Sequence, residues 1–416
     1  MQVECEKCGT INEYPENQTC PECNTILKPN DDTSIKTIGN EKTEIKIEKF
    51  QIFHNTQRII ITISIFFICI IILILLFPLD KNKNNFNQFH TIYNKEGPIP
   101  KGKLKWKFKT EGEIVSSPAV GEDIVYFASL DGNIYAFNIS TGKQKWFYKT
   151  GASISSSPLL YKDTLFVGTS KYLYALDPYT GKEKWKNTTN YEIFSSPIGD
   201  KNNIFISSND GSLYSFDIKD GKQKWKSKIS KEIFASPIIS NKIIYIGTID
   251  KNFYAINSDD GIPLWNFKSD SEIYSTASIE NNFIYFASFN GYIYALDIKG
   301  KLIWKHNTYT NLISSPIVYN NVLYIGGKDR KLRVLDTKTG KQLWFYETNG
   351  EILSTCDIVS NNMYFGANDN SFYSIDLKSH TTNWKFETQN SIVCSPVVRN
   401  GKIFFGSWDY NFYVLE

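Results

Sequence analysis

Eight tryptophans recur along the chain at intervals of 39 or 40 residues. Two further features keep step with them: a Ser-Ser-Pro-like triplet and a Tyr-Ala-Leu-Asp-like run that is usually followed by Thr-Gly-Lys or Asp-Gly-Lys. A period of this length is typical of solenoids and propellers. The tryptophans are Trp106, Trp146, Trp185, Trp225, Trp265, Trp304, Trp344 and Trp384.

Each repeat is predicted to form four strands. In the first repeat they span 114–120, 124–128, 133–137 and 144–148. Gly132 and Gly142 mark tight turns, because glycine adopts positive φ without strain. The second strand is apolar throughout, as expected of a strand covered on both faces. Aromatic residues make up 15% of the chain, which also favours strands, and the sequence predicts an all-β fold.

The two ends of the repeat region predict how a ring would close. The last repeat stops at Glu416 after its third strand, and residues 102–106 form a fourth strand that has no repeat of its own. Pairing these two segments completes an eighth unit and leaves no open seam. The fold class is therefore an eight-bladed β-propeller over 102–416.

The repeats resemble those of pyrroloquinoline-quinone (PQQ)-type propellers, with their Tyr-Ala-Leu-Asp run, Thr-Gly-Lys turn and docking tryptophan. That family includes quinoprotein alcohol dehydrogenases and the non-enzymatic propeller lipoprotein of the outer-membrane assembly machinery. The resemblance implies the fold, and it is compatible with both an enzyme and a scaffold.

An apolar run at 58–79 carries no charge after Arg58, and its apolar part extends from Ile59 to Leu79, with Pro78 near the end. As a helix it would span roughly 31 Å, which matches a bilayer core of about 30 Å. We expect one transmembrane helix here, with polar linkers at 29–57 and 80–101. A buried core helix is the alternative, but such helices are seldom apolar on every side.

Two Cys-x-x-Cys pairs lie near the start of the chain, at Cys5, Cys8, Cys20 and Cys23. Four thiolates form a soft tetrahedral set suited to Zn²⁺, and the alternative is a pair of disulfides. The segment resembles the short zinc ribbons found ahead of transmembrane helices in many prokaryotic proteins. We expect a structural zinc ribbon at 1–28, which needs its metal to fold.

The zinc thiolates indicate an orientation, because free thiolates persist in a reducing compartment. The sequence therefore predicts a plasma-membrane protein with a cytoplasmic ribbon, one crossing of the lipid bilayer and an extracytoplasmic propeller. The distribution of basic residues weakly favours the same orientation, because slightly more of them precede the predicted helix than follow it. They are Lys42, Lys46, Lys49 and Arg58 before it, and Lys81, Lys83 and Lys95 after it. A formal net charge of +3 gives no reason to expect nucleic-acid binding.

The signs of quinoprotein chemistry are missing from the sequence. The related dehydrogenases hold PQQ with a disulfide between adjacent cysteines and with a calcium site, and this chain has no adjacent cysteines. Cys356 and Cys394 are interpreted as buried free thiols, with a disulfide as the alternative. His306 and His380 fall on a fourth strand and in a turn. The Ser-Ser pairs recur in every repeat and are interpreted as structural. We therefore expect neither bound PQQ nor catalysis.

One face of the predicted ring collects acidic and apolar turn residues, and the other collects lysines. An aspartate in these turns is a common turn former, so its recurrence also has a purely structural interpretation. Apolar side chains in turns are harder to explain without a partner. The sixth repeat departs from the pattern, with Lys328, Arg330, Lys331 and Arg333, which we interpret as a solvated edge. The candidate partner-binding residues are Trp408, Phe289, Ile249, Leu130, Asp409, Asp250 and Asp131.

These features favour a membrane-anchored, non-catalytic scaffold that binds a protein, peptide or glycan. A PQQ-dependent oxidoreductase is the first alternative. A transmembrane sensor, whose ribbon docks a cytosolic partner, is the second.

Overall fold

The computed structural model describes residues 2–4, 11–13, 97–189 and 191–416. Strands β1 (Gln2–Glu4) and β2 (Ile11–Glu13) pair antiparallel, with Glu4 opposite Ile11. The four predicted zinc ligands, the predicted linker at 29–57, the predicted helix at 58–79 and residues 80–96 of the second linker lie outside the described residues. Nowhere in the described segments is there a helix with the length and hydropathy needed to cross a bilayer.

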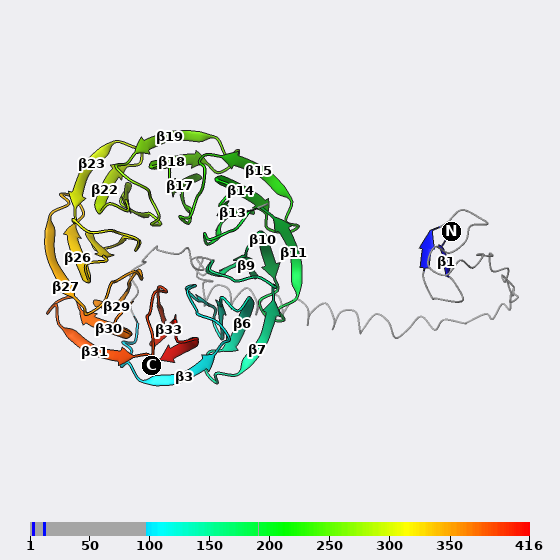
Figure 1. Cartoon of the computed structure of the whole chain (residues 1–416), viewed down its shortest axis with the longest axis horizontal. Coiled ribbons are helices and arrows are strands. Elements are labelled where there is room, and N and C mark those ends of the chain that lie inside the picture. Colours follow the sequence, from blue (N-terminus) through cyan, green and yellow to red (C-terminus); the bar gives the residue numbers. More distant parts are fainter. Residues whose placement is uncertain (1, 5–10, 14–96, 190) are drawn as a thin grey trace, which may run out of the picture. The chain divides into compact units, whose positions relative to one another are not determined.

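Within residues 97–416 the chain forms eight four-stranded antiparallel sheets arranged as blades around a ring (Figure 1). In each blade the strands run A, B, C, D from the centre outward. The prediction of an eight-bladed propeller is confirmed. The A strands are β4 (Ala119–Val120), β8 (Leu159–Tyr161), β12 (Ile198–Asp200), β16 (Ile238–Ser240), β20 (Ser278–Glu280), β24 (Ile317–Tyr319), β28 (Asp357–Val359) and β32 (Val397–Arg399).

The B strands are the most deeply buried part of each blade. Four of five residues or more are buried in every one, which fits their apolar sequences. They are β5 (Ile124–Ala128), β9 (Thr164–Gly168), β13 (Asn203–Ser208), β17 (Ile243–Gly247), β21 (Phe283–Ala287), β25 (Val322–Gly326), β29 (Asn362–Gly366) and β33 (Lys402–Gly406).

The C strands pair with the B strands, and the D strands form the outer wall. The C strands are β6 (Asn133–Asn138), β10 (Tyr172–Leu176), β14 (Ser212–Asp217), β18 (Asn252–Asn257), β22 (Tyr292–Asp297), β26 (Lys331–Asp336), β30 (Ser371–Asp376) and β34 (Asn411–Leu415). The D strands are β7 (Gln144–Lys149), β11 (Glu183–Thr188), β15 (Gln223–Lys228), β19 (Pro263–Lys268), β23 (Leu302–Asn307), β27 (Gln342–Glu347), β31 (Thr382–Glu387) and β3 (Leu104–Lys109).

The A strands are shorter than predicted. The first was expected at 114–120, but β4 holds only Ala119 and Val120. Pro118 has no amide proton for a ladder bond, and the Ser116 hydroxyl bonds to the backbone of Ala128 instead. The rest of the predicted strand is a segment that connects strand D of one blade to strand A of the next.

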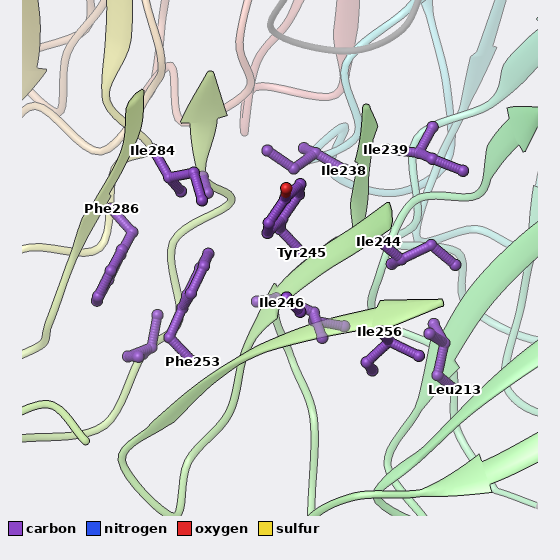
Figure 2. Close-up of a cluster of buried hydrophobic side chains, with 14 of the residues drawn as sticks. Leu213, Ile238, Ile239, Ile244, Tyr245, Ile246, Phe253, Ile256, Ile284 and Phe286 are labelled. Atoms are coloured by element: carbon purple, nitrogen blue, oxygen red, sulfur yellow. The ribbon is translucent and has the colours of Figure 1, made fainter. Parts of the chain in front are cut away.

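Blades pack face to face through apolar side chains. Figure 2 shows one such cluster, in which Phe253 of β18 and Phe286 of β21 stack with ring centroids 4.2 Å apart. Tyr245 and Ile284 belong to the same buried cluster. Because each blade contributes to the core on both of its sides, adjacent blades stabilise one another.

Seven of the repeat tryptophans dock on the C–D turn of the following blade, and Trp384 docks on Pro100 and Gly102, ahead of β3. The indole of Trp106 donates a hydrogen bond of 3.0 Å to the Ile139 carbonyl, and its ring covers Gly142 so closely that a Cβ there would lie 2.8 Å away. Gly142 also has a φ of 65°, so both space and conformation require glycine. In the seventh blade His380 replaces this glycine and stacks on Trp344 at 4.1 Å.

The ring closes where the sequence predicts. Strand β3 pairs with β34, with Lys107 opposite Tyr413, and completes the eighth blade. Lys103 and Glu416 exchange two backbone hydrogen bonds of 2.9 and 2.8 Å. The eight blades and the seven buried hydrophobic clusters between them are built from residues 97–416 alone. This part therefore has its own closed core, and we expect it to fold by itself.

The described end of the predicted linker lies on the propeller. Gly97 exchanges hydrogen bonds of 3.2 Å with the Ser360 hydroxyl, and the Trp384 indole donates to the Pro100 carbonyl. Ser360 belongs to an A–B turn. The chain therefore reaches the ring on the side of the A–B and C–D turns, which we call the C–D face.

Candidate functional site

The B–C turns and the segments that connect strand D to the next strand A share the other side of the ring, which we call the B–C face. Backbone hydrogen bonds join each turn to a connecting segment. The amides of Leu130, Phe289 and Trp408 donate to carbonyls of the segments that lead into their own blades, at 2.8 to 3.0 Å. Turns and segments thus form one continuous surface.

The candidate aspartates are half-buried and bonded within the fold. Asp131 accepts hydrogen bonds of 2.8 Å from the Asn133 amide and from the Tyr135 hydroxyl. Asp409 accepts a bond of 2.6 Å from the Tyr413 hydroxyl in the same way. These carboxylates shape their turns, as the structural interpretation of the sequence pattern expects.

The aspartates also connect neighbouring blades. Asp409 accepts a hydrogen bond of 3.0 Å from the amide of Gln389, which follows the D strand of the preceding blade. Burial would raise the pKa of Asp409, but the bonds from Tyr413, Gln389 and Asn411 outweigh it and lower the pKa. Asp250 differs, since its carboxylate accepts from the Thr248 hydroxyl of its own turn.

The candidate apolar residues are placed unequally. The Trp408 side chain is 40% exposed, whereas Leu130, Ile249 and Phe289 are half-buried. The Phe289 ring lies edge-on to Tyr274, with centroids 5.5 Å apart. The structure therefore attaches one predicted residue to a larger aromatic group.

That group is an arc of four rings across three adjacent blades, which we call the aromatic arc: Phe194, Phe234, Tyr274 and Phe289. Ring centroids lie 5.4 Å apart between Phe194 and Phe234, and 5.7 Å apart between Phe234 and Tyr274. Phe194 is 39% exposed, and the other three are half-buried. Phe194, Phe234 and Tyr274 were not among the residues predicted from the sequence.

The arc is part of an inner ring that contains one residue from each blade. Each segment that connects strand D to the next strand A contributes one member of this ring. The residue before that member is a buried Ile or Leu, and the residue after it is also buried. The ring position itself is half-buried or exposed, and it is apolar in seven of the eight blades described. Its members are Val115, Ser155, Phe194, Phe234, Tyr274, Ile313, Leu353 and Val393.

Close packing fixes this position. A Cβ on Gly406, at the end of β33, would lie 2.1 Å from the Ile114 side chain, so the buried isoleucine fits directly against the backbone of the preceding blade. The same contact links Gly247 with Ile273. The ring residue that follows is therefore held outward on the B–C face.

Carboxylates surround the apolar ring. A glutamate directly precedes the buried Ile in five connecting segments, and each of these glutamates is half-buried or exposed. A hydrogen bond from Ser271 lowers the pKa of Glu272. Next to the arc, Tyr191, Asp210, Lys231 and Glu232 help to line a polar groove of about 480 Å³. The five glutamates are Glu113, Glu192, Glu232, Glu272 and Glu351.

The interpretation of the sixth blade as a solvated edge is wrong for Arg333, which is 6% exposed. Its guanidinium pairs with Asp329 through two contacts, one of 2.9 Å, and donates to the Thr308 carbonyl at 3.2 Å. Tyr214 contacts Asp210 and Thr189 from the equivalent position. Arg333 therefore replaces a structural tyrosine.

The repeated serines are structural, as predicted. The amide of Ser117 donates to the Ser157 hydroxyl at 2.9 Å, and the Ser157 amide donates to Ser196 at 3.1 Å. Such bonds link six of the eight junctions between described blades, including the junction of the last blade with the first. We call this circle of bonds the serine girdle.

The cysteines and histidines of the propeller do not converge on a site. Cys356 and Cys394 are both free and buried, so the disulfide alternative is not observed. Burial raises the pKa of the Cys394 thiol to about 12. His306 lies on β23, where burial lowers its pKa, and His380 stacks on Trp344 in a C–D turn.

The Cys394 thiol donates a hydrogen bond to the Gly406 carbonyl and accepts one from the Gly406 amide. Across the described ranges, no three His, Cys, Asp or Glu side chains gather closely enough to hold a metal ion.

Comparison with known proteins identifies the family and fold. The family model described as outer membrane protein assembly factor BamB matches residues 99–198, 188–317 and 289–407. No curated protein sequence matches the chain.

Solved structures share the propeller. BamB from Moraxella catarrhalis is 17% identical with a TM-score of 0.66, covering 76% of this chain and 99% of that protein. The computationally designed Ika8 protein is 17% identical, with a TM-score of 0.68 over 77% of this chain and 99% of the design. Quinohemoprotein alcohol dehydrogenase from Comamonas testosteroni is 14% identical, with a TM-score of 0.65 over 77% and 78% of the two chains. Because the family model matches well over half of its length, the chain belongs to the family of outer membrane protein assembly factor BamB.

Proposed function

We propose that the protein is a non-catalytic scaffold that binds a partner protein or peptide on the B–C face of its propeller. The aromatic arc carries the proposal. Exposed aromatic side chains that touch one another across blades are typical of binding hot spots, because they bury a large apolar area with little loss of conformational freedom. The fold does not require an aromatic side chain at position 194, because Ser155 occupies the equivalent position of the second blade.

The chemistry of the face specifies the partner. The apolar inner ring would take an apolar or aromatic side chain, and the surrounding glutamates would attract lysines or arginines beside it. The partner is therefore a segment that combines apolar anchors with positive charge. Trp408, Asp131, Asp250 and Asp409 lie on the same face and extend the surface outward. A glycan that stacks on the arc is the alternative ligand.

The N-terminal region completes the proposed protein. A zinc ribbon at Cys5, Cys8, Cys20 and Cys23 would lie in the cytoplasm, and a helix at 58–79 would hold the propeller outside. The antiparallel pairing of β1 and β2 supports the ribbon, because the six residues between these strands include Cys5 and Cys8. Reducing conditions in the cytoplasm would keep the zinc thiolates intact.

The experiment is a pull-down of the full chain from native membranes after crosslinking. We expect one set of partners with the wild type and its loss from a variant with Phe194→Ser and Phe234→Ser. Phe147→Ser is the matched control, since Phe147 is 58% exposed on β7, away from the arc. Equal capture by the wild type and the arc variant would contradict the proposal.

A second measurement separates the scaffold from an oxidoreductase. The purified protein is incubated with PQQ and calcium, and the bound quinone is measured by its absorbance. We expect no stoichiometric binding, because the sequence has no pair of adjacent cysteines. A chromophore at one per chain would favour the oxidoreductase.

A further inference from the structure

The outer wall of the propeller has one position per blade at which the chain bulges. Beside each docking tryptophan the register between strands C and D shifts, so that the residue before the tryptophan is the extra residue of a β-bulge. This residue is lysine in four consecutive blades, aliphatic in the next three and asparagine in the last. The eight residues are Lys105, Lys145, Lys184, Lys224, Leu264, Ile303, Leu343 and Asn383.

The aliphatic bulge residues belong to a larger exposed patch. Leu264 is 52% exposed, Ile303 43% and Leu343 53%. Three further apolar residues are exposed at the C–D ends of the same blades. We call the six residues the apolar rim: Ile262, Leu264, Ile298, Leu302, Ile303 and Leu343.

Tryptophan docking connects the rim from one blade to the next. Trp265, adjacent to Leu264, donates a hydrogen bond of 3.2 Å to the carbonyl of Ile298 in the following blade. Its ring covers Gly300, two residues before Leu302. Strands β19, β23 and β27 follow one another on the outside of the ring in Figure 1. The apolar rim therefore continues across three blades, where the outer wall meets the C–D face.

The bulges argue against a partner that adds a β-strand to the outer edge of a blade. An added β-strand needs a regular row of amides and carbonyls on the outer edge, and a bulge interrupts that row in every D strand. The rim therefore offers side chains rather than backbone, and its partner must accept exposed aliphatic groups without strand pairing.

Positive charge lies beside the apolar rim. Lys299 and Lys301 occupy the turn that carries Ile298, and Lys341 is two residues before Leu343. All three are exposed, and within residues 97–189 and 191–416 none of them forms an ion pair.

The carboxylates near Ile262 are already engaged. Asp259 pairs with Lys242 at 2.9 Å, and Asp260 accepts a hydrogen bond of 2.9 Å from the Ile262 amide. The side chains exposed at this edge are therefore the aliphatic residues of the apolar rim, the three lysines and the carboxylate of Asp260, which has no salt bridge among the described residues.

We propose that the apolar rim and its lysines form a contact site for an anionic lipid surface. Aliphatic side chains that enter the head-group region, together with lysines that bind lipid phosphates, are the two components of interfacial membrane binding. The rim lies on the C–D side of the ring, where residues 97–101 approach. The site is independent of the partner surface on the B–C face.

The test uses the propeller from Gly97 to Glu416, which has its own closed core, and vesicles of phosphatidylcholine with and without phosphatidylglycerol. Cosedimentation should show binding to the anionic vesicles that weakens as salt is added. Changing Leu264, Ile303 and Leu343 to Ser should reduce the partition coefficient about tenfold. Phe147→Ser, at a similarly exposed position on β7 that is not part of the apolar rim, should leave it unchanged.

Two results would overturn the proposal. The first is wild-type propeller that stays in the supernatant with anionic vesicles, or a triple variant that binds as well as Phe147→Ser. The second is a wild-type dimer in solution that the triple variant abolishes, because the rim would then bind a second copy. Lys299→Glu with Lys301→Glu separates charge from apolar contact, and we expect it to weaken binding only to the anionic vesicles.

Discussion

The backbone amide of Ser395 donates a hydrogen bond of 3.1 Å to the hydroxyl of Ser117, although the two residues lie 278 positions apart. The bond joins the eighth blade to the first and continues the serine girdle across the closure of the ring. This bond closes the ring on its inner side, and the pairing of β3 with β34 closes it at the outer wall. The ring is therefore closed at two radii.

Removing the acceptor tests the inner closure. Ser117→Ala leaves the Ser395 amide without its partner in a part-buried site, which costs about 1–2 kcal/mol. We expect the free energy of unfolding in guanidinium to fall by this amount. Ser196→Ala removes the equivalent bond inside the ring and is the control. No change in either variant would show that the girdle bonds contribute nothing.

Removing the outer closure should be far more damaging. Deleting Lys103–Lys109 takes away β3, exposes the edge of β34 and removes the docking of Trp106. An open apolar edge invites pairing with other chains, so we expect aggregation in size-exclusion chromatography. Lys107→Ala, which keeps the strand, should remain monodisperse. A soluble, heat-resistant deletion variant would contradict the importance of closure.

Arg333 allows a test by exchange. Arg333→Ala leaves Asp329 half-buried without its cation, and we expect a loss of about 2–4 kcal/mol in unfolding free energy. Arg333→Tyr restores the pairing found between Tyr413 and Asp409, so it should recover most of that loss. If Arg333→Tyr is as unstable as Arg333→Ala, the two pairings are not equivalent.

The same pair predicts a pH dependence. Burial alone would raise the pKa of Asp329, but hydrogen bonds and charge from Arg333 outweigh it and lower the pKa. A depressed folded-state pKa contributes stability above the unfolded value of about 3.9, and this stability is lost as the pH falls through the folded value. The difference in unfolding free energy between the wild type and Arg333→Ala should therefore shrink between pH 7 and pH 3. If this free-energy difference does not change with pH, the loss of stability in Arg333→Ala comes from packing and not from the charge of Asp329.

The N-terminal cysteines give a metal prediction. Under reducing conditions residues 1–30 should bind one zinc ion, because two Cys-x-x-Cys pairs supply four thiolates. Metal analysis after gel filtration measures the stoichiometry, and a chelator should unfold the peptide. Cys20→Ser should lower zinc retention, whereas Thr19→Ser should not. Zinc absent from the reduced wild-type peptide would rule out the ribbon.

The parts of the fold that could be predicted from sequence were those in which a single strand or turn has a characteristic local residue pattern. The run Ile124–Ala128 is apolar at every position because both faces are covered, and Gly142 marks a turn because a docked indole excludes any side chain. The extent of strand A was not predictable in this way. Pro118 ends the ladder because it has no amide proton, and the Ser116 hydroxyl bonds to the backbone of Ala128 in strand B.

The aromatic arc was missed for a related reason. Phe194 sits between a buried isoleucine and a buried serine in a segment that looks like an ordinary strand. Its exposure depends on Ile193 fitting against Gly168 of the preceding blade, which only the assembled ring shows. Arg333 was misjudged likewise, because its partners Asp329 and Thr308 come from a turn and from a neighbouring blade.

The exchange of hydrogen bonds between Lys103 and Glu416 places the two ends of the repeat region side by side. A short turn linker there, with new ends cut into a C–D turn such as Lys299-Gly300, would give a circular permutant with the same eight blades. The point of attachment could thus move around the circumference while the B–C face stays intact. The attachment point and the recognition surface can therefore be changed independently in this architecture. A series of permutants could move the attachment point around the ring, relative to the partner-binding residues, by one blade at a time.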